Sequence, residues 1–223
     1  MRIAKLALVI SRWPAIQRLT LCRWTLEVEE AGYQVPVRHM PKLTYLKFEK
    51  MGLDAVRGTL AMINAPGLET LLIEDVEDPL GGWLDELWAL IEFQRMDCLQ
   101  HLRLHKFQKN DGPCTLASIL RVAPNITHLS ISDTEPDVFE SIVRCEDYDT
   151  MARHLQVLDI DAAIWPFEHI LRFIHSRART LKQVHVPQPL VAKLAEGLKP
   201  IGEVEISALE SARSWKAELK YLS

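Results

Sequence analysis

The chain lacks any apolar run of about 18 residues or more, so no segment is long enough to cross a membrane as a helix. The apolar run Leu6–Ile10 is too short for a secretory signal, and Ser11 and Arg12 follow it. The net charge is only −4, which gives no electrostatic footprint for binding nucleic acid. We therefore expect a cytoplasmic or nuclear protein whose partner is neither a membrane nor a nucleic acid.

Cysteine is scarce, and the motifs of common enzyme classes are missing. The chain has four cysteines: Cys22, Cys98, Cys114 and Cys145. None forms a C-x-x-C pair, so we interpret them as reduced thiols that pack as small apolar side chains. The glycines at 81–82 and the turn at 110–112 lie outside any phosphate-loop or nucleophile-elbow motif. We predict that the chain is not an enzyme and holds no cofactor.

What the sequence does contain is a repeated hexapeptide, Leu-x-x-Leu-x-Leu, in which other apolar residues can replace leucine. It occurs eight times, with its first residue at Ile16, Leu43, Leu68, Leu99, Ile126, Leu155, Leu181 and Ile201. In each copy the fourth and sixth residues are apolar and lie two apart, so on a strand they share one face, while the third and fifth point to the other. One repeat buries too few apolar side chains to fold alone, so the repeats must stack.

Segments with helical spacing lie between the hexapeptides. The clearest are Asp54–Ala65, Trp83–Phe93, Leu116–Ala123 and Phe167–Ala178. Strands that alternate with helices form a parallel sheet with helices on one face. We therefore predict an α/β fold: one curved solenoid over residues 1–223, with parallel strands on the concave side and helices on the convex side.

Prolines and the two chain ends complete this organisation. A proline stands two residues before four of the hexapeptides, at Pro14, Pro41, Pro66 and Pro124. We expect each to end a preceding helix and begin an extended segment. Residues 1–12 carry a helical apolar stripe that is either the back half of a repeat or a capping helix. Residues 208–222 form an amphipathic pattern that predicts a helix capping the edge of the last strand.

The whole chain resembles leucine-rich-repeat proteins of the longer, helix-containing type, and the resemblance rests on the hexapeptides. The family's asparagine or cysteine at position nine is missing, because that position holds residues such as Trp24, Met51 and Thr134. The uneven spacers and stretches such as Asp78–Leu80 resemble the C-terminal repeat region of fungal F-box-like proteins. That resemblance implies a substrate-binding part of a ubiquitin-ligase receptor. The F-box itself, which would bind the cullin-ligase adaptor, is not found in this sequence.

Outward residues of successive strands should form ladders across the concave face, where a partner would bind. The third-position ladder is Arg18, Tyr45, Thr70, His101, His128, Val157, Gln183 and Glu203, and the fifth-position ladder is Thr20, Lys47, Leu72, Arg103, Ser130, Asp159, His185 and Glu205. We expect this face to be basic near the N-terminus and acidic near the C-terminus, which would orient an extended partner. The predicted contact residues are Arg18, Tyr45, Lys47, Leu72, His101, Arg103, His128, Asp159, His185, Glu203 and Glu205.

Two groups of ladder residues have more than one interpretation. Tyr45, Leu72 and Val157 are either anchors for a partner or isolated apolar side chains, and we favour the anchor for Tyr45. His101 and His128 occupy equivalent positions on neighbouring strands, which is compatible with zinc. Arg103 nearby would repel a cation and no further ligand is placed to complete the site, so we expect no metal.

These observations favour a binding module over an enzyme. The first hypothesis is recognition of a protein partner on the concave face, as the substrate-binding part of an F-box-like receptor. The adaptor of the cullin ligase would be a second partner only if an F-box lies upstream. The alternative is a leucine-rich-repeat scaffold or inhibitor that acts alone by covering its partner.

Overall fold

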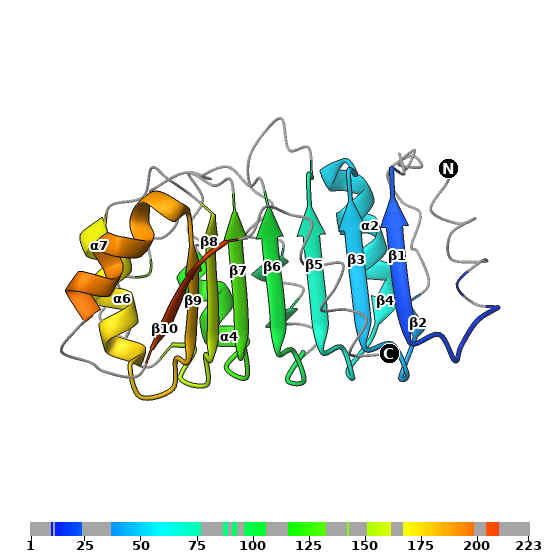
Figure 1. The fold of residues 1–223 in the computed structure, drawn as a ribbon. Helices are drawn as coiled ribbons and strands as arrows, with labels where there is room; N and C mark the ends of the chain where they lie inside the picture. The colour runs from blue at the N-terminus through cyan, green and yellow to red at the C-terminus, as the bar shows by residue number, and fades with distance from the viewer. Residues whose placement is uncertain are drawn as a thin grey trace.

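Eight parallel strands form the main sheet of this protein (Figure 1). The computed structural model describes residues 10, 12–23, 37–76, 87–88, 91–92, 96–105, 116–132, 142, 151–161, 167–198 and 204–209. In order across the sheet, the strands are β1 (Arg18–Cys22), β3 (Tyr45–Glu49), β5 (Thr70–Glu74), β6 (His101–His105), β7 (His128–Ser132), β8 (Val157–Asp161), β9 (Gln183–Val186) and β10 (Glu205–Ala208). Every neighbouring pair runs parallel, so the predicted α/β class and parallel sheet are confirmed.

The strands pair in the register that the hexapeptides predict, except in the last one. Leu19 pairs with Leu46, for example. The fourth positions stay aligned as far as β9, and the sixth positions stay aligned as far as β8. In β10, however, Ile206 pairs with Val184, and Glu205 pairs with Gln183. The last repeat therefore starts two residues later than predicted. A shift of two keeps the same side chains on the inner face, so the alternating pattern could not distinguish the two registers.

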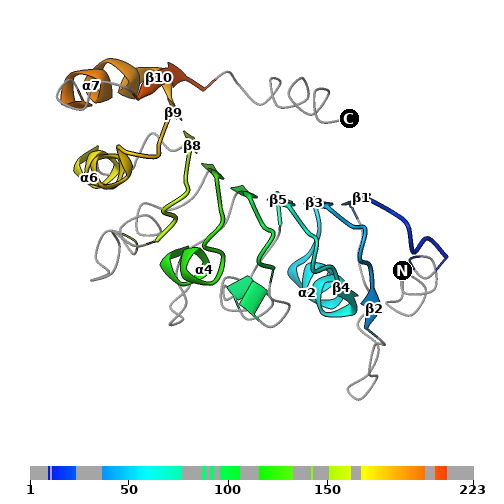
Figure 2. The ribbon, with the colours of Figure 1, turned by 90° about the horizontal axis from the view of Figure 1, so that it is seen from below.

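Four helices are assigned in the described part of the chain: α2 (Leu53–Met62), α4 (Leu116–Val122), α6 (Phe167–Arg177) and α7 (Gln188–Leu198). Figure 2 shows that the sheet curves and that α2, α4 and α6 lie on its convex side. Three of them match predicted helices. Of the predicted Trp83–Phe93 helix, only residues 87–88 and 91–92 are described, and these are helical. None of these helices has the length and apolar character needed to cross a membrane.

Helix α2 ends early because the chain after it forms a second, short sheet. Its last residue is Met62, and β4 (Ile63–Asn64) then pairs with β2 (Arg38–His39). Helix α7 was not predicted. Pro189 is its second residue, where the missing amide of proline costs no helical hydrogen bond.

A tight turn precedes the strands, and the recurrent prolines belong to it. In each case the proline is the second of four residues, and the first and fourth are joined by a backbone hydrogen bond. The bonds run from Ile16 to Trp13, Leu43 to Met40, Leu68 to Ala65 and Ile126 to Ala123. Proline favours this position because its fixed φ matches the turn. The expectation that each proline ends a helix is therefore corrected, since β2 and β4 precede Pro41 and Pro66.

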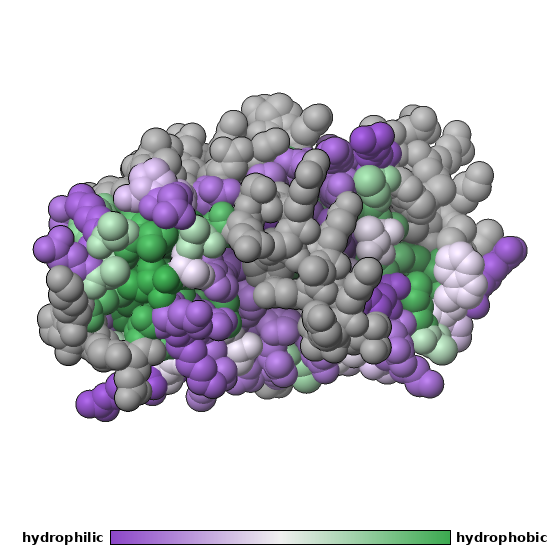
Figure 3. All heavy atoms as spheres, viewed as in Figure 1, coloured by the Kyte–Doolittle hydropathy of each residue, from purple (hydrophilic) through white to green (hydrophobic). Residues whose placement is uncertain are grey.

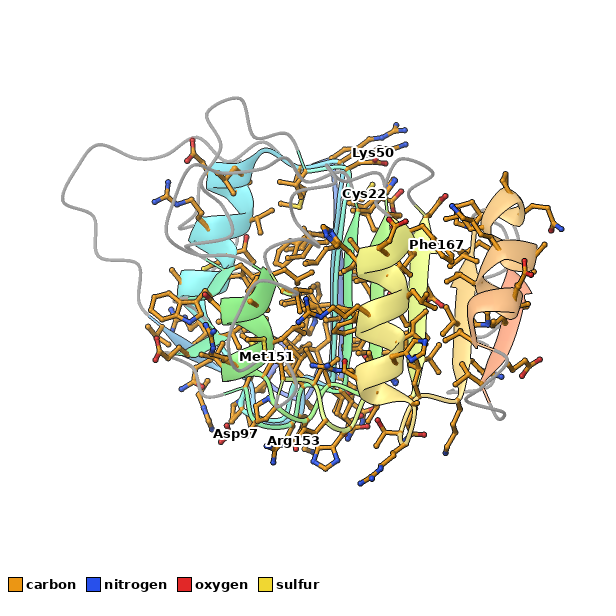
Figure 4. The ribbon with its side chains drawn as sticks, turned by 90° about the vertical axis from the view of Figure 1, so that its left-hand side faces the viewer. Cys22, Lys50, Asp97, Met151, Arg153 and Phe167 are labelled. Carbon is orange, nitrogen blue, oxygen red and sulfur yellow. The ribbon has the colours of Figure 1, made fainter. Side chains whose placement is uncertain are left out.

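The same turn forms without proline before β6 and β8. Leu99 donates to the carbonyl of Met96, and Leu155 donates to that of Ala152. Figure 4 shows Asp97 and Arg153, which lie within these two turns, at one end of the strands, and Cys22 and Lys50 at the other. The turns thus lie together at one end of the strands, whatever residue occupies their second position.

At the opposite end of the strands, each of the first three strands is followed by a residue whose backbone is in the left-handed conformation. Arg23, Lys50 and Asp75 have φ values of 55°, 53° and 53°, and each stands seven residues after the start of its hexapeptide. The amides of Arg23 and Lys50 donate to the carbonyls of Glu49 and Glu74 on the next strand. A residue with a β-carbon is strained in this conformation, so each of these three residues lowers the stability of the fold.

The apolar core lies between the sheet and the helices. Inward residues of the six internal strands, such as Phe48, are fully buried, and Phe173 of α6 packs among them. Arg177, also on α6, is buried with 3 % of its surface exposed. It donates a 2.7 Å hydrogen bond to the Met151 carbonyl, and its guanidinium lies 4.4 Å from the centre of the Phe173 ring. This contact fastens α6 to the segment before β8.

The two predicted end caps lie almost entirely outside the described residues. Of residues 1–12, the structure describes Ile10, which is helical, and Arg12. Of residues 208–222, it describes Ala208, which still belongs to β10, and Leu209. A helix beginning at residue 208 is therefore wrong for that residue.

Candidate interaction face

The concave face of the sheet carries the side chains that the sequence analysis selected. In the structure the third-position ladder is Arg18, Tyr45, Thr70, His101, His128, Val157, Gln183 and Glu205, and the fifth-position ladder is Thr20, Lys47, Leu72, Arg103, Ser130, Asp159, His185 and Ser207. Glu205 is thus in a different ladder from the one predicted, because β10 is shifted by two residues. Glu203 lies outside the described residues.

At the N-terminal end, Arg18 and Tyr45 form a cation–π pair. The guanidinium carbon of Arg18 lies 4.1 Å from the centre of the Tyr45 ring. Arg18 is exposed, but only 7 % of Tyr45 is exposed. Burial raises the pKa of the Tyr45 hydroxyl. Tyr45 therefore offers a partner little surface as an anchor, and the exposed group of this pair is Arg18.

Next to this pair, four charged residues from β3, β5 and β6 form an ion-pair network. The Lys47 ammonium lies 3.0 Å from Glu49 Oε2 and 2.7 Å from Glu74 Oε2, and Arg103 Nε lies 3.3 Å from Glu74 Oε1. Burial alone would lower the pKa of Lys47, but its hydrogen bonds to the two glutamates outweigh burial and raise it. The hydrogen bond from Lys47 likewise lowers the pKa of Glu49. The charges of this region are largely balanced within the face itself.

Five residues from the five consecutive strands β5 to β9 form a second cluster. Asp159 of β8 accepts a 2.8 Å hydrogen bond from His128 Nε2 of β7 and a 2.5 Å bond from His185 Nδ1 of β9. The His128 ring also contacts His101 of β6 edge-on, with ring centroids 5.6 Å apart. His101 Nδ1 in turn shares a 3.2 Å hydrogen bond with Thr70 Oγ1 of β5. Hydrogen bonds and ring contact thus connect five neighbouring strands.

Burial and hydrogen bonding have opposite effects on the pKa of the Asp159 carboxyl. The side chain is 1 % exposed, and such burial would raise the pKa of its carboxyl. The hydrogen bonds from His128 and His185 outweigh that effect, so the pKa lies below its ordinary value. Asp159 is therefore an ionised internal acceptor that orients two imidazoles, rather than a charge that a partner touches directly. For His101, burial first and the charge of His128 second lower the pKa.

The remaining predicted contact residues that the structure describes also lie on the concave face. Leu72 is half-buried on the face, as is Val157. Glu205 is exposed at the C-terminal end, where Gln183 Nε2 donates a 3.1 Å hydrogen bond to its Oε2. Exposed charges at the two ends still have the predicted signs, with Arg18 at one and Glu205 at the other. The middle of the predicted gradient is weaker, because Lys47, Arg103 and Asp159 are paired within the face.

The histidines do not assemble a metal site within the described residues. His105, two positions beyond Arg103, forms a 3.4 Å contact with Asp75 Oδ1 instead of approaching His101 or His128. A search of the described part of the chain finds no group of three or more ligating side chains placed to hold a metal ion.

Sequence reasoning selected most of these residues but missed how they pair. Glu74 and Thr70 were not chosen as site residues, yet each connects two neighbouring strands. The ladders contained part of the signal, because residues two apart on adjacent strands are diagonal neighbours. Asp159 is diagonal to His128 and directly opposite His185.

No protein-family model matches this chain, and a search of curated proteins finds no match either. The geometry of the open face therefore carries the functional argument.

Proposed function

We propose that the chain is a curved leucine-rich-repeat solenoid that recognises a protein partner on its concave face. The observation that supports this most is the continuous pair of ladders over eight aligned strands. At about 4.8 Å between neighbouring strands, the seven spacings give a face about 34 Å wide. That width suits a macromolecule, and it matches the elongated binding surfaces of repeat proteins.

The bonding within the face supports recognition in a second way. Lys47, Glu74 and Arg103 are held by ion pairs, and His128 and His185 are held by Asp159. Side chains already fixed in the free protein lose little further rotational freedom when a partner binds. Their donors and acceptors are therefore arranged before the encounter, which favours specificity.

A specific form of the proposal is the substrate-binding part of an F-box-like ubiquitin-ligase receptor. It follows from the resemblance of the uneven repeats to fungal F-box-like proteins. In this form the concave face selects the substrate, and the cullin-ligase adaptor binds only through an F-box upstream. Capture of that adaptor by the full natural gene product supports this form. Capture of a concave-face partner without the adaptor favours a scaffold or inhibitor that acts alone.

The test of the recognition function compares charge introduced on the two faces. Leu72→Lys and Val157→Lys, made together, place two new charges on the concave face, where both residues are half-buried. Glu168→Lys places a charge on the exposed side of α6. Partners captured from source cells by the wild-type protein are then titrated against each variant, after circular dichroism shows that each is folded.

We expect the concave-face variant to bind a captured partner at least about tenfold more weakly, while Glu168→Lys binds as the wild type does. Equal binding by the concave-face variant and the wild type would contradict the proposal. A loss confined to Glu168→Lys would place recognition on the convex side instead.

A further inference from the structure

On the six internal strands of the sheet, the apolar residues that point inward are completely buried. On β3, β5, β6, β7, β8 and β9, the two inward residues at positions four and six are each at most 1 % exposed. This coverage comes from a neighbouring strand on both sides and from the helices beneath.

The inward apolar residues of the two outer strands are less completely buried. Leu19 on β1 is only half-buried, although Leu46 beside it is fully buried. On β10, Ile206 and Ala208 are both half-buried, although their partners Val184 and Val186 are fully buried. Figure 3 shows apolar side chains gathered at both ends of the sheet, near β1 and near α7 and β10. Each end thus leaves apolar surface that an added strand would cover.

The backbone of both outer strands also has groups directed away from the sheet. The Gln17 carbonyl and the Arg23 amide bond to β3, so the intervening Arg18 and Thr20 direct their backbone groups to the outer edge. On β10, the amides of Glu205 and Leu209 bond to β9. The backbone groups of Ile206 and Ala208 therefore point away from β9, to the outer edge of β10. Among the described strands, each of these edges lacks a neighbour.

The side chains at the two edges carry opposite charges at equivalent positions. Arg18 of β1 and Glu205 of β10 both belong to the third-position ladder, and both are exposed. All strands run parallel, so β1 of a second molecule could continue the sheet beyond β10 without changing direction. In that register, Arg18 of one molecule would lie beside Glu205 of the other, about 4.8 Å away between strands.

We propose that this chain associates head to tail with further copies of itself, through β1 of one copy and β10 of the next. The contact joins two different surfaces, so it leaves a free edge at each end and builds open chains. Trp13 and Val37, which are 57 % and 59 % exposed, lie in the segments leading into β1 and β2. They provide further apolar surface on the copy that contributes β1.

The competing occupant of the β10 edge is the helix that the sequence predicts over residues 208–222. Ala208 already departs from that prediction, because it belongs to β10. If the rest of the segment caps the edge, the protein is a monomer at every concentration. The oligomeric state therefore distinguishes a second copy from a cap.

Sedimentation velocity over a wide range of concentration tests the proposal with charge-reversal variants of the whole chain. We expect the mean mass of the wild-type protein to rise with concentration beyond that of a dimer. Arg18→Glu and Glu205→Arg should each weaken association at least about tenfold, because each places like charges side by side. Glu69→Arg is the matched control, since Glu69 is exposed beside the internal strand β5 and should leave association unchanged.

Mixing the two variants gives the most specific result. Arg18→Glu keeps Glu205 on β10, which fits the Arg18 that Glu205→Arg keeps on β1. The glutamate that Arg18→Glu introduces on β1 likewise fits the arginine that Glu205→Arg introduces on β10. An equimolar mixture should therefore form open chains in which the two variants alternate, and the double variant should form open chains by itself. A wild-type protein that stays monomeric, or that stops at a dimer, would overturn the proposal. So would single variants that associate normally, or a mixture that associates no more strongly than each single variant alone.

Discussion

His128 Nε2 donates a 2.8 Å hydrogen bond to Asp159 Oδ2, across the neighbouring strands β7 and β8. The same carboxylate accepts from His185 on the other side, so one buried anion joins three strands. Stability and the shape of the concave face therefore depend on the same residue.

Replacing Asp159 should destabilise the fold. Asp159→Ala removes both hydrogen bonds to the imidazoles, and we expect the free energy of unfolding to fall by about 2–3 kcal/mol. Asp159→Asn keeps the shape but has a single acceptor oxygen, so it should lose less. Unfolding in urea measures both values, with Asp161→Asn as the control because Asp161 is exposed on the same strand. A loss in Asp161→Asn equal to that in Asp159→Ala would contradict the assignment.

His101 should make stability depend on pH in the mildly acidic range. Burial and the charge of His128 hold its pKa below 6.5 in the folded state, so the unfolded chain takes up this proton first as the pH falls. The stability that neutral His101 provides is complete above about pH 6.5 and is lost as the pH falls toward the lowered pKa. Chemical unfolding at a series of pH values should give a shallower decline for His101→Gln than for the wild type. An equal or steeper decline would contradict this account.

Asp159 should make stability depend on pH in a separate, more acidic range. Its folded-state pKa lies below 3.8, so its contribution is complete above that pH and is lost as the pH falls through the lowered value. Asp159→Asn should therefore remove part of the loss of stability below about pH 4. It should leave the pH dependence caused by His101 unchanged. Acid unfolding followed by tryptophan fluorescence measures this difference. A wild-type acid transition unchanged in Asp159→Asn would show that other carboxyl groups control it.

Arg177 should be important for stability although it lies far from the proposed face. Arg177→Ala removes the buried bond to the Met151 carbonyl and the contact with Phe173, and we expect a loss of about 3 kcal/mol. Arg177→Lys should recover only part of it, because an ammonium cannot reproduce the planar stacking. Arg179→Ala is the control, since Arg179 is exposed. Comparable melting temperatures for the two alanine variants would show that the buried contact contributes nothing.

Glycine at position 50 should stabilise the protein. Lys50 is exposed and has a φ of 53°, a conformation in which glycine lacks the clash of a β-carbon. We expect Lys50→Gly to raise the free energy of unfolding by about 0.5–1 kcal/mol. Lys50→Ala removes the same charge but keeps the β-carbon, so it should give no gain. A gain of similar size in both variants would point to charge rather than backbone strain.

The apolar triplets predicted seven strands with their register, because each triplet has large aliphatic residues on one face. The eighth failed by two residues, since the sixth position of the true repeat is Ala208, a weaker signal than Ile206. Helix α7 was missed because Pro189 resembles a break in a pattern rather than the first turn of a helix. The ladders identified which residues share the concave face.

The pairing of those residues could not be predicted in the same way. Whether Asp159 faces a partner or turns to His128 depends on rotamers and burial, which the spacing of residues does not contain. The same holds for Lys47, whose ammonium reaches Glu74 on the next strand.

Site-specific photo-crosslinking tests the central claim, that the concave face contacts a protein partner, most directly. A photoreactive residue is placed at Leu72 on the concave face and, separately, at Glu168 on the convex helix α6, and the crosslinked partners are identified by mass spectrometry. The account predicts that one partner is captured from position 72 and not from position 168. Capture of that partner from position 168 alone would contradict it.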